Sequence, residues 1–161
     1  MAITRHVFGP CLINVGQQGG STSQLGYSSE GLVFHQYFLK NDVISDRFGP
    51  LCPVDSQNML SYIEFEFELV EWDATVINSI TVDRYAGTPG TVGGPGVFMI
   101  QGGFCWRVAI ASGYSEPTVN FVSCFPLEVT LNESTQYARA FMRWKAIPNS
   151  AGVIFNNTAP T

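Results

Sequence analysis

Apolar and polar residues alternate most clearly between Tyr62 and Val70. Because successive side chains of a strand face opposite sides, this stretch predicts a half-buried strand with one apolar face and one acidic face. The apolar face would carry Ile63, Phe65, Phe67 and Leu69, and the acidic face Glu64, Glu66 and Glu68. Like charges in this arrangement cost little beside water or cations, but would be prohibitive if buried and unpaired, so the surroundings of the acidic face become the main functional question.

Residues 136–147 alternate in the same way and predict a second long strand. One face would carry Tyr137, Arg139, Phe141, Arg143 and Lys145, and the other Ala138, Ala140, Met142, Trp144 and Ala146. Cross-strand pairing of the glutamates with the basic residues of this strand is therefore one interpretation of the acidic face.

Shorter segments rich in β-forming residues predict further strands. They lie at residues 6–15, 32–39, 104–111, 121–125 and 127–131, with one more short strand at 42–46. The segment 32–39 alternates imperfectly, so we expect it to be buried on much of both faces. Residues 25–31 predict a tight turn before it, and residues 46–55 predict a turn-dense loop after it.

A short helix is predicted from Asp73 to Ile80, because Asp73 can cap its first turn and Val76, Ile77 and Ile80 fall at helical spacing. Together these elements predict a mainly-β fold, a β-sandwich or half-barrel of about eight strands with one short flanking helix. Residues 1–147 are expected to form a single domain. Residues 148–161 are expected to form a C-terminal extension that is ordered only if something holds it.

The composition predicts a surface that is largely covered by other molecules. Charged residues make up 13% of the chain and hydrophobic residues 45%, whereas about a quarter of a typical soluble domain is charged. We infer that other copies or a partner cover much of the surface. The net charge of −5 argues against nonspecific nucleic-acid binding, which needs clustered Lys and Arg. No apolar run approaches the length of a membrane span and no secretory signal is evident, so we expect synthesis in the cytoplasm without export.

No set of residues predicts a catalytic, cofactor-binding or metal site. The four cysteines form no C-x-x-C pair and are expected to be buried free thiols: Cys11, Cys52, Cys105 and Cys124. His6 lies near the start of the chain, and His35 falls in an apolar segment where a core histidine is expected. Neither G-x-S-x-G nor H-E-x-x-H occurs, and evenly spaced glutamates on one strand do not make the positioned pair of a glycosidase. We therefore expect no enzymatic activity.

A glycine- and proline-rich loop spans residues 87–96. A phosphate-binding P-loop needs Gly-Lys-Ser/Thr opening a helix, and this segment lacks it. Loops of this composition often reach out to neighbours, so an inter-subunit contact is expected from Gly87, Thr88, Pro89, Gly90, Thr91, Val92, Gly93, Gly94, Pro95 and Gly96.

The order of turns and strands resembles that of bacteriophage tail-tube proteins. The resemblance rests on residues 25–33 (LGYSSEGLV), the loop 45–55 (SDRFGPLCPVD), the alternating strand that ends in LVEWD at residues 69–73, and the short helix after it. The closing strand 137–147, with Pro148 just after it, also resembles the last strand of that family. The cysteines, the 87–96 loop and the tail after Pro148 depart from the family pattern.

The resemblance implies a structural protein of the virion, assembled in the cytoplasm of the bacterial host. Copies would close their sheets into a hexameric ring, and rings would stack into a tube through which DNA passes without specific binding. The partners would be identical copies and other virion proteins, with no membrane, cofactor or small-molecule substrate. Such a ring would cover edge strands. A lumen lined by Glu64, Glu66 and Glu68 would repel phosphate, which is the functional alternative to cross-strand pairing.

Two other interpretations stay open. A capsid decoration or cement protein would stabilise the head and need no charged lumen. A carbohydrate- or receptor-binding β-domain would use exposed rings such as Tyr85, Trp106 or Tyr114 as stacking platforms, although aromatic residues of β-proteins more often belong to the core.

Overall fold

The computed structural model describes residues 9–18, 20–44, 53–80, 105–112, 118–133, 138–149 and 151–156. These residues form eight strands and one short helix. The strands are β1 (Cys11–Gln17), β2 (Ser23–Ser28), β3 (Val33–Ile44), β4 (Pro53–Trp72), β5 (Trp106–Ser112), β6 (Val119–Glu133), β7 (Ala138–Ala146) and β8 (Phe155–Asn156), and the helix is α1 (Ala74–Ile80). The predicted mainly-β fold with one short helix is confirmed.

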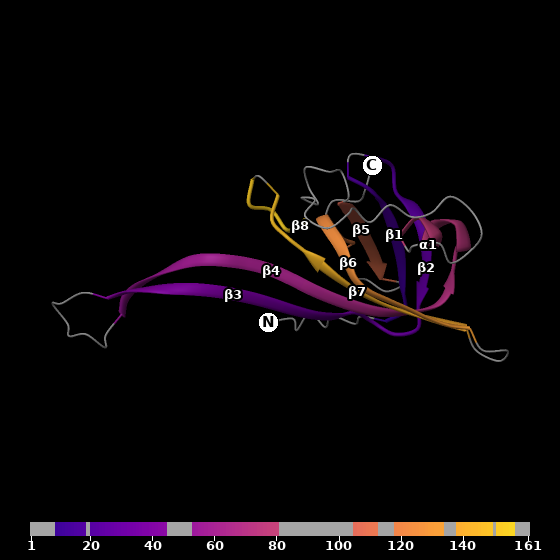
Figure 1. Ribbon diagram of the computed structural model, residues 1–161, viewed down its shortest axis with the longest axis horizontal. Coiled ribbons are helices and arrows are strands. Elements are labelled where there is room, and N and C mark those ends of the chain that lie inside the picture. The colour runs from indigo at the N-terminus through magenta and orange to yellow at the C-terminus, as the bar shows by residue number, and fades with distance from the viewer. Residues whose placement is uncertain are drawn as a thin grey trace, which may run out of the picture.

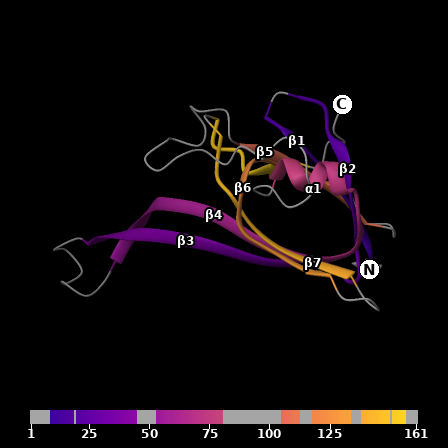
Figure 2. The ribbon, with the colours of Figure 1, turned by 45° about the vertical axis from the view of Figure 1, so that its right-hand side comes forward.

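All these strands belong to one antiparallel sheet in the order β2-β1-β5-β6-β7-β4-β3, with β8 paired to β6. The end of β4 also pairs with β2, which brings distant members of this order together. The sheet therefore curves into a partial ring, seen from two directions in Figure 1 and Figure 2. Pairing a sheet back on itself satisfies strand edges that would otherwise stay open.

Inward-facing side chains of the ring form the hydrophobic core. Phe65 on β4 stacks on Phe121 of β6, with ring centroids 4.3 Å apart and planes at 8°. Phe65 also lies nearly parallel to Trp144 of β7, at 6.4 Å. The alternation predicted for β4 and β7 is confirmed, because the buried set includes Ile63, Phe65, Phe67, Leu69, Ala140, Met142, Trp144 and Ala146.

β2 completes the ring in a place where the sequence predicts a turn. The prediction of a tight turn over residues 25–31 is wrong for residues 25–28, which belong to β2. Gly26 lies so close to β4 that an added Cβ would stand 1.9 Å from the Glu71 carbonyl oxygen. The glycine therefore serves the close approach of two strands and not a turn.

β6 is longer than the two strands predicted for this part of the chain. Residues 121–125 and 127–131 belong to one strand that passes through Pro126. The ladder between β6 and β7 shifts register between Pro126 and Glu128, so the proline lies at a bulge. A bulge tolerates the missing N–H of proline, and the strand continues through it.

α1 begins where the sequence predicts. Asp73 Oδ1 accepts hydrogen bonds from the backbone N–H groups of Thr75, at 2.8 Å, and Val76, at 2.9 Å. These contacts satisfy donors that the first turn of a helix leaves free, so Asp73 is the N-cap. Ile77 and Ile80 are buried and attach the helix to the hydrophobic core.

The ring holds part of the C-terminal extension. β8 pairs with β6 through Asn156 opposite Asn120 and Phe155 opposite Phe121. The Val122 N–H also donates to a carbonyl of the extension, at 3.2 Å. The expected neighbour that orders this segment is thus β6 of the same chain. The predicted inter-subunit loop, residues 87–96, lies outside the described residues.

β3 and the first half of β4 leave the ring as a long two-stranded projection (Figure 1). β7 pairs with β4 only from Ile63 to Leu69, whereas β3 pairs with β4 as far as Pro53. We call residues 37–44 of β3 together with residues 53–62 of β4 the ribbon. Beyond the ladder with β7, the described strands of the ribbon have only each other as neighbours in the sheet.

The ribbon corrects three predictions. The loop expected at residues 46–55 ends earlier, because β4 begins at Pro53. The short strand expected at residues 42–46 is, as far as Ile44, the end of β3. The prediction that the segment 32–39 is buried on much of both faces is wrong for residues 33–39, because β3 is exposed at every residue. Phe34 packs near Phe121 at the border of the ring, but residues 37–44 project beyond the core.

Candidate assembly surface

The acidic face predicted for β4 lies on the outside of the ring, because the alternate residues of β4 fill the core. The neighbouring strand on this face is β7, which carries the predicted basic residues. In the ladder, Glu64 lies opposite Lys145, Glu66 opposite Arg143 and Glu68 opposite Phe141. The register therefore brings the acidic and basic residues of the two predicted strands together.

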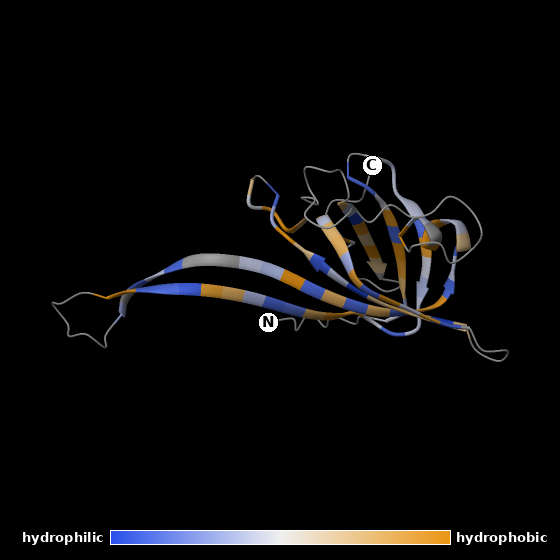
Figure 3. Cartoon of the chain, in the orientation of Figure 1, coloured by the Kyte–Doolittle hydropathy of each residue, from blue (hydrophilic) through white to orange (hydrophobic). Residues whose placement is uncertain are grey.

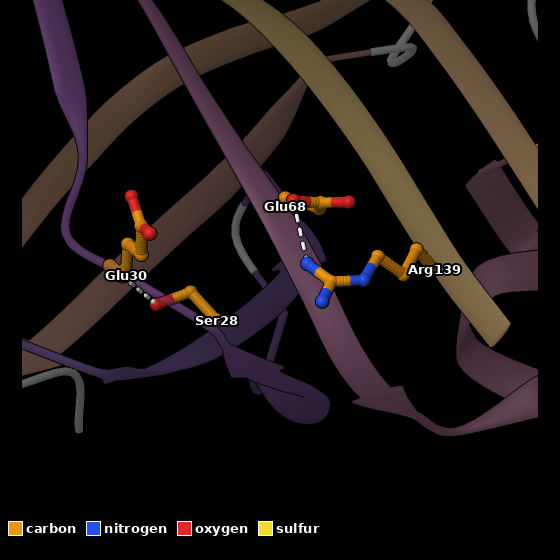
Figure 4. A network of polar contacts seen from close by, with 4 residues as sticks. All are labelled: Ser28, Glu30, Glu68 and Arg139. Carbon is orange, nitrogen blue, oxygen red and sulfur yellow. Dashed lines mark hydrogen bonds and ion pairs between the residues drawn. The ribbon is translucent and has the colours of Figure 1, made fainter. Parts of the chain in front are cut away.

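Two of the three glutamates form ion pairs across this ladder. Arg143 donates to the Glu64 carboxylate, and Arg139 Nη1 donates to Glu68 Oε2 at 3.0 Å (Figure 4). Glu64 is 9% exposed, so its partner also compensates for lost hydration. Its hydrogen bond raises the pKa of Arg143, because a carboxylate favours the charged guanidinium. Cross-strand pairing is thus present for Glu64 and Glu68, and a lumenal position of this face stays a prediction.

The outer face is close to balanced in charge. Glu128 of β6 lies opposite Arg143 in the next ladder. Lys145 Nζ lies 3.9 Å from the centre of the Tyr62 ring, in a cation–π contact. Four acidic residues (Glu64, Glu66, Glu68 and Glu128) stand against three basic ones (Arg139, Arg143 and Lys145). The face therefore lacks the excess of positive charge that holds phosphate groups.

The ribbon exposes large apolar side chains on both of its faces. The exposed fractions on β3 are 40% for Tyr37, 55% for Phe38, 58% for Leu39, 46% for Val43 and 55% for Ile44. Strand alternation places Phe38 and Ile44 on one face and Leu39 and Val43 on the other. Figure 3 shows apolar residues interspersed with polar ones along the projecting strands. An isolated two-stranded ribbon is marginally stable in water, so this surface is typical of an interaction site.

β3 also presents an open edge. In the described part of the chain, β4 is the only strand that pairs with β3, which leaves the other edge of residues 35–44 without a neighbouring strand. Proteins usually protect such edges with bulges, prolines or charges. The ribbon ladder has two irregularities, but both place the extra residue, at positions 59 and 54, on β4. β3 itself therefore remains a regular strand edge.

A shallow apolar pocket lies where the ribbon leaves the ring. Its lining residues come from β3, β4, β6 and β8: Phe34, Gln36, Ile63, Val119, Phe121 and Phe155. The Phe34 and Phe121 ring centroids lie 5.9 Å apart, and those of Phe121 and Phe155 lie 6.1 Å apart. Phe34 and Phe38 share one face of β3, so the pocket continues the apolar surface of the ribbon toward the ring.

The cysteines agree with their predicted state where the structure describes them. Cys11, Cys105 and Cys124 are buried free thiols. Burial raises the pKa of each thiol, most strongly for Cys124, which also interacts with Cys105. Raised pKa values keep these sulfurs protonated and unreactive in the folded chain. Cys52 lies outside the described residues.

The structure also decides the predictions for one histidine and one tryptophan. His35 is exposed on β3, opposite Glu64 in the ladder, so the prediction of a core histidine is wrong. Trp106 is 7% exposed and belongs to the core, so it is no stacking platform. His6, Tyr85 and Tyr114 lie outside the described residues.

Sequence reasoning missed the ribbon, although its signal is present in the chain. Residues 37–44 carry apolar side chains at both odd and even positions. Such a strand is expected when both faces are buried in a core. The same pattern is equally typical of a strand that a second chain covers.

Among the described residues, no group of His, Cys, Asp and Glu is placed to hold a metal ion. α1, the helix of the described ranges, has neither the length nor the apolar character of a membrane span. Comparison with known proteins finds no family model that matches the chain and no matching curated protein.

Proposed function

We propose that this chain is a structural protein of a bacteriophage virion, which assembles with identical copies into hexameric rings that stack into a tail tube for DNA passage. The resemblance of its turns and strands to tail-tube proteins suggests the virion, and the exposed ribbon supports assembly. The ribbon is the observation that carries the proposal, because a lone protomer leaves its apolar faces in water.

The dimensions of the ribbon fit an inter-subunit contact. Its β3 portion, residues 37–44, spans about 26 Å at about 3.3 Å per residue, and two strands are about 10 Å wide. Each face therefore offers about 260 Å². Covering both faces would bury about 1,000 Å² counted over both partners, which is near the lower limit of a specific interface. In a ring, each copy would insert its ribbon against one neighbour and receive the ribbon of another.

The charge of the chain fits a channel that lets DNA slide. The net charge is −5, and the outer face of β4 and β7 balances its glutamates with arginines. Neither property attracts phosphate, so DNA would meet little electrostatic retention along such a wall. The lumenal position proposed for Glu64, Glu66 and Glu68 belongs to this function.

Electron microscopy of the concentrated purified protein, and of the virus particles that contain it, tests the proposal. Stacked rings with an open channel are expected. Density confined to capsid facets would favour a decoration protein, and a monomer at every concentration would contradict assembly altogether.

A matched pair of variants tests the ribbon as the contact. Leu39→Ser removes an apolar side chain that is 58% exposed on the ribbon, and Leu127→Ser removes one that is 45% exposed on β6. We expect Leu39→Ser to reduce the yield of rings strongly while Leu127→Ser leaves it unchanged. Equal yields from the two variants would show that the ribbon is not the contact.

A further inference from the structure

The distal half of β3 is self-complementary when read in antiparallel orientation. Residues 38–44 read F-L-K-N-D-V-I: two apolar residues, a base, an amide, an acid and two apolar residues. Each of these residues is exposed. They lie on a regular edge of the sheet with which no described strand pairs, and the bulged residues lie on the far strand of the ribbon.

We propose that two copies of this chain pair antiparallel through residues 38–44 of β3, about a two-fold axis at Asn41. The β4-β3 ribbon of each copy would then continue into that of the other as one four-stranded sheet. The partner is thus a second copy of this chain, recognised by strand addition along an open edge. A two-fold contact uses the same surface on both copies, so every complementary pair occurs twice.

The proposed register matches the chemistry of opposite residues. With Asn41 opposite its own copy, Lys40 lies opposite Asp42, Leu39 opposite Val43, and Phe38 opposite Ile44. Directly opposite residues of an antiparallel pair share one face of the sheet and have Cβ atoms in contact range. Each apolar side chain therefore meets an apolar one, and each charge meets its opposite.

Neighbouring registers lose this match. On an edge strand, every second residue directs its N–H and C=O groups toward the new partner strand. Two directly opposite residues must both be of this kind or both of the other kind, so a two-fold register can change the sum of paired residue numbers only in steps of two. One step places Lys40 opposite Lys40, and the other places Asp42 opposite Asp42. Like charges directly opposite are destabilising. Lys40 and Asp42 thus select the register centred on Asn41.

The projection of the ribbon leaves room for this pairing. Asn41 lies eight positions beyond Val33, the first residue of β3. At about 3.3 Å per residue, the partial ring of each copy would lie about 26 Å from the two-fold axis. The partial rings of the two copies would lie at opposite ends of the shared sheet. Figure 2 shows the ribbon extending clear of the ring, with β3 along one side of it.

This dimer goes beyond the proposed hexameric ring and differs from that ring in geometry. In a hexameric ring, one surface of each copy contacts a different surface of the next copy, whereas in the dimer the same edge of β3 is used by both copies. The dimer is therefore the state of the free protein. The dimer covers a strand edge to which further chains could otherwise add without limit. It separates when the copies enter a hexameric ring.

Charge exchange at Lys40 and Asp42 tests the dimer. Lys40→Asp places two acids opposite each other twice, and Asp42→Lys does the same with two bases. Sedimentation of the full chain over a dilution series should show a wild-type dimer and a dissociation constant at least about tenfold higher for each single variant. The variant that carries both substitutions restores opposite charges and should return close to wild-type dimerisation.

Glu71→Lys is the matched control, because it reverses an exposed charge on β4 at the ring and outside the ribbon. It should leave the dimer unchanged. Circular dichroism checks that each variant is folded, and added salt should reduce the difference between the single variants and the wild type. Single variants that dimerise as the wild type does, or a double variant that fails to recover, would overturn the proposal.

The outcome is separable from that of the proposed function. Hexameric rings from a protein that shows no dimer in the dilution series would exclude the proposed dimer and leave the proposed hexameric ring in place. A dimer that follows the charge-exchange pattern, from a protein that never forms rings, would do the opposite. A monomer under all conditions would contradict both.

Discussion

β4 crosses two regions of the molecule whose surroundings differ. From Ile63 to Leu69 it pairs with β7, its apolar face is buried and two of its outer glutamates have arginine partners. From Pro53 to Tyr62 its described neighbour in the sheet is β3 alone, a strand exposed at every residue. The comparison teaches that the ring completes its own core within one chain, whereas the ribbon leaves large apolar side chains of β3 exposed among polar ones.

The largest expected effect comes from removing one phenylalanine from each region. Phe65→Ala empties the centre of the aromatic stack and should lower the free energy of unfolding by about 3–5 kcal/mol. Phe38→Ala, at a side chain that is 55% exposed, should lower it by about 0.5 kcal/mol or less in a dilute monomer. Urea denaturation of both variants measures the contrast, and similar losses would contradict the division into ring and ribbon.

A smaller effect is expected from opening the ring at β2. Gly26→Ala pushes a Cβ against the Glu71 carbonyl and should destabilise the chain by about 1–3 kcal/mol. Gly20→Ala is the control, because its added Cβ would meet its nearest neighbour, the Gln17 carbonyl oxygen, at 3.4 Å. Thermal unfolding compares the two. An unchanged melting temperature for Gly26→Ala would show that the contact between β2 and β4 is not needed to close the ring.

The helix cap should contribute less again. Asp73→Ala leaves the N–H groups of Thr75 and Val76 without their acceptor and should cost about 1 kcal/mol. Asp73→Asn keeps a capping oxygen, so most of this stability should return. If Asn and Ala destabilise equally in denaturant titrations, the charge of Asp73 matters more than its cap.

The smallest effect is expected at the exposed ion pair on the outer face. Arg139 and Glu68 have side chains that are 45% and 40% exposed, so Arg139→Met should change stability by under about 1 kcal/mol, and by less in high salt. Arg143→Met should cost more, because it leaves the carboxylate of the buried Glu64 without its partner. The reverse order in paired denaturation curves would show that burial of Glu64 does not control these pairs.

Local pattern is sufficient to predict β4, β7 and α1, the elements in which alternation or a capping residue is clearest. Strict alternation identifies the buried faces of β4 and β7, and Asp73 identifies the start of α1. The sequence also contains the alternative pairing of Glu64 and Glu68 with basic residues of β7, because both strands show their charged faces by the same alternation.

The course of β2, the bulge in β6 and the exposure of β3 depend on contacts between distant residues, which the local sequence pattern does not predict. Gly26 looks like a turn residue, but it is required by the close approach of β4. Pro126 looks like a strand break, but a bulge against β7 accommodates it. The apolar residues of β3 look like those of a core strand, but the strand projects from the ring and leaves them exposed.

Hydrogen exchange of β3 as a function of protein concentration tests most directly whether the ribbon is completed by another copy. We predict that the amides of residues 38–44 that point away from β4 exchange rapidly in dilute protein and become protected as concentration rises, while amides of β7 keep the same protection throughout. Exchange in residues 38–44 that does not change with concentration would contradict the account.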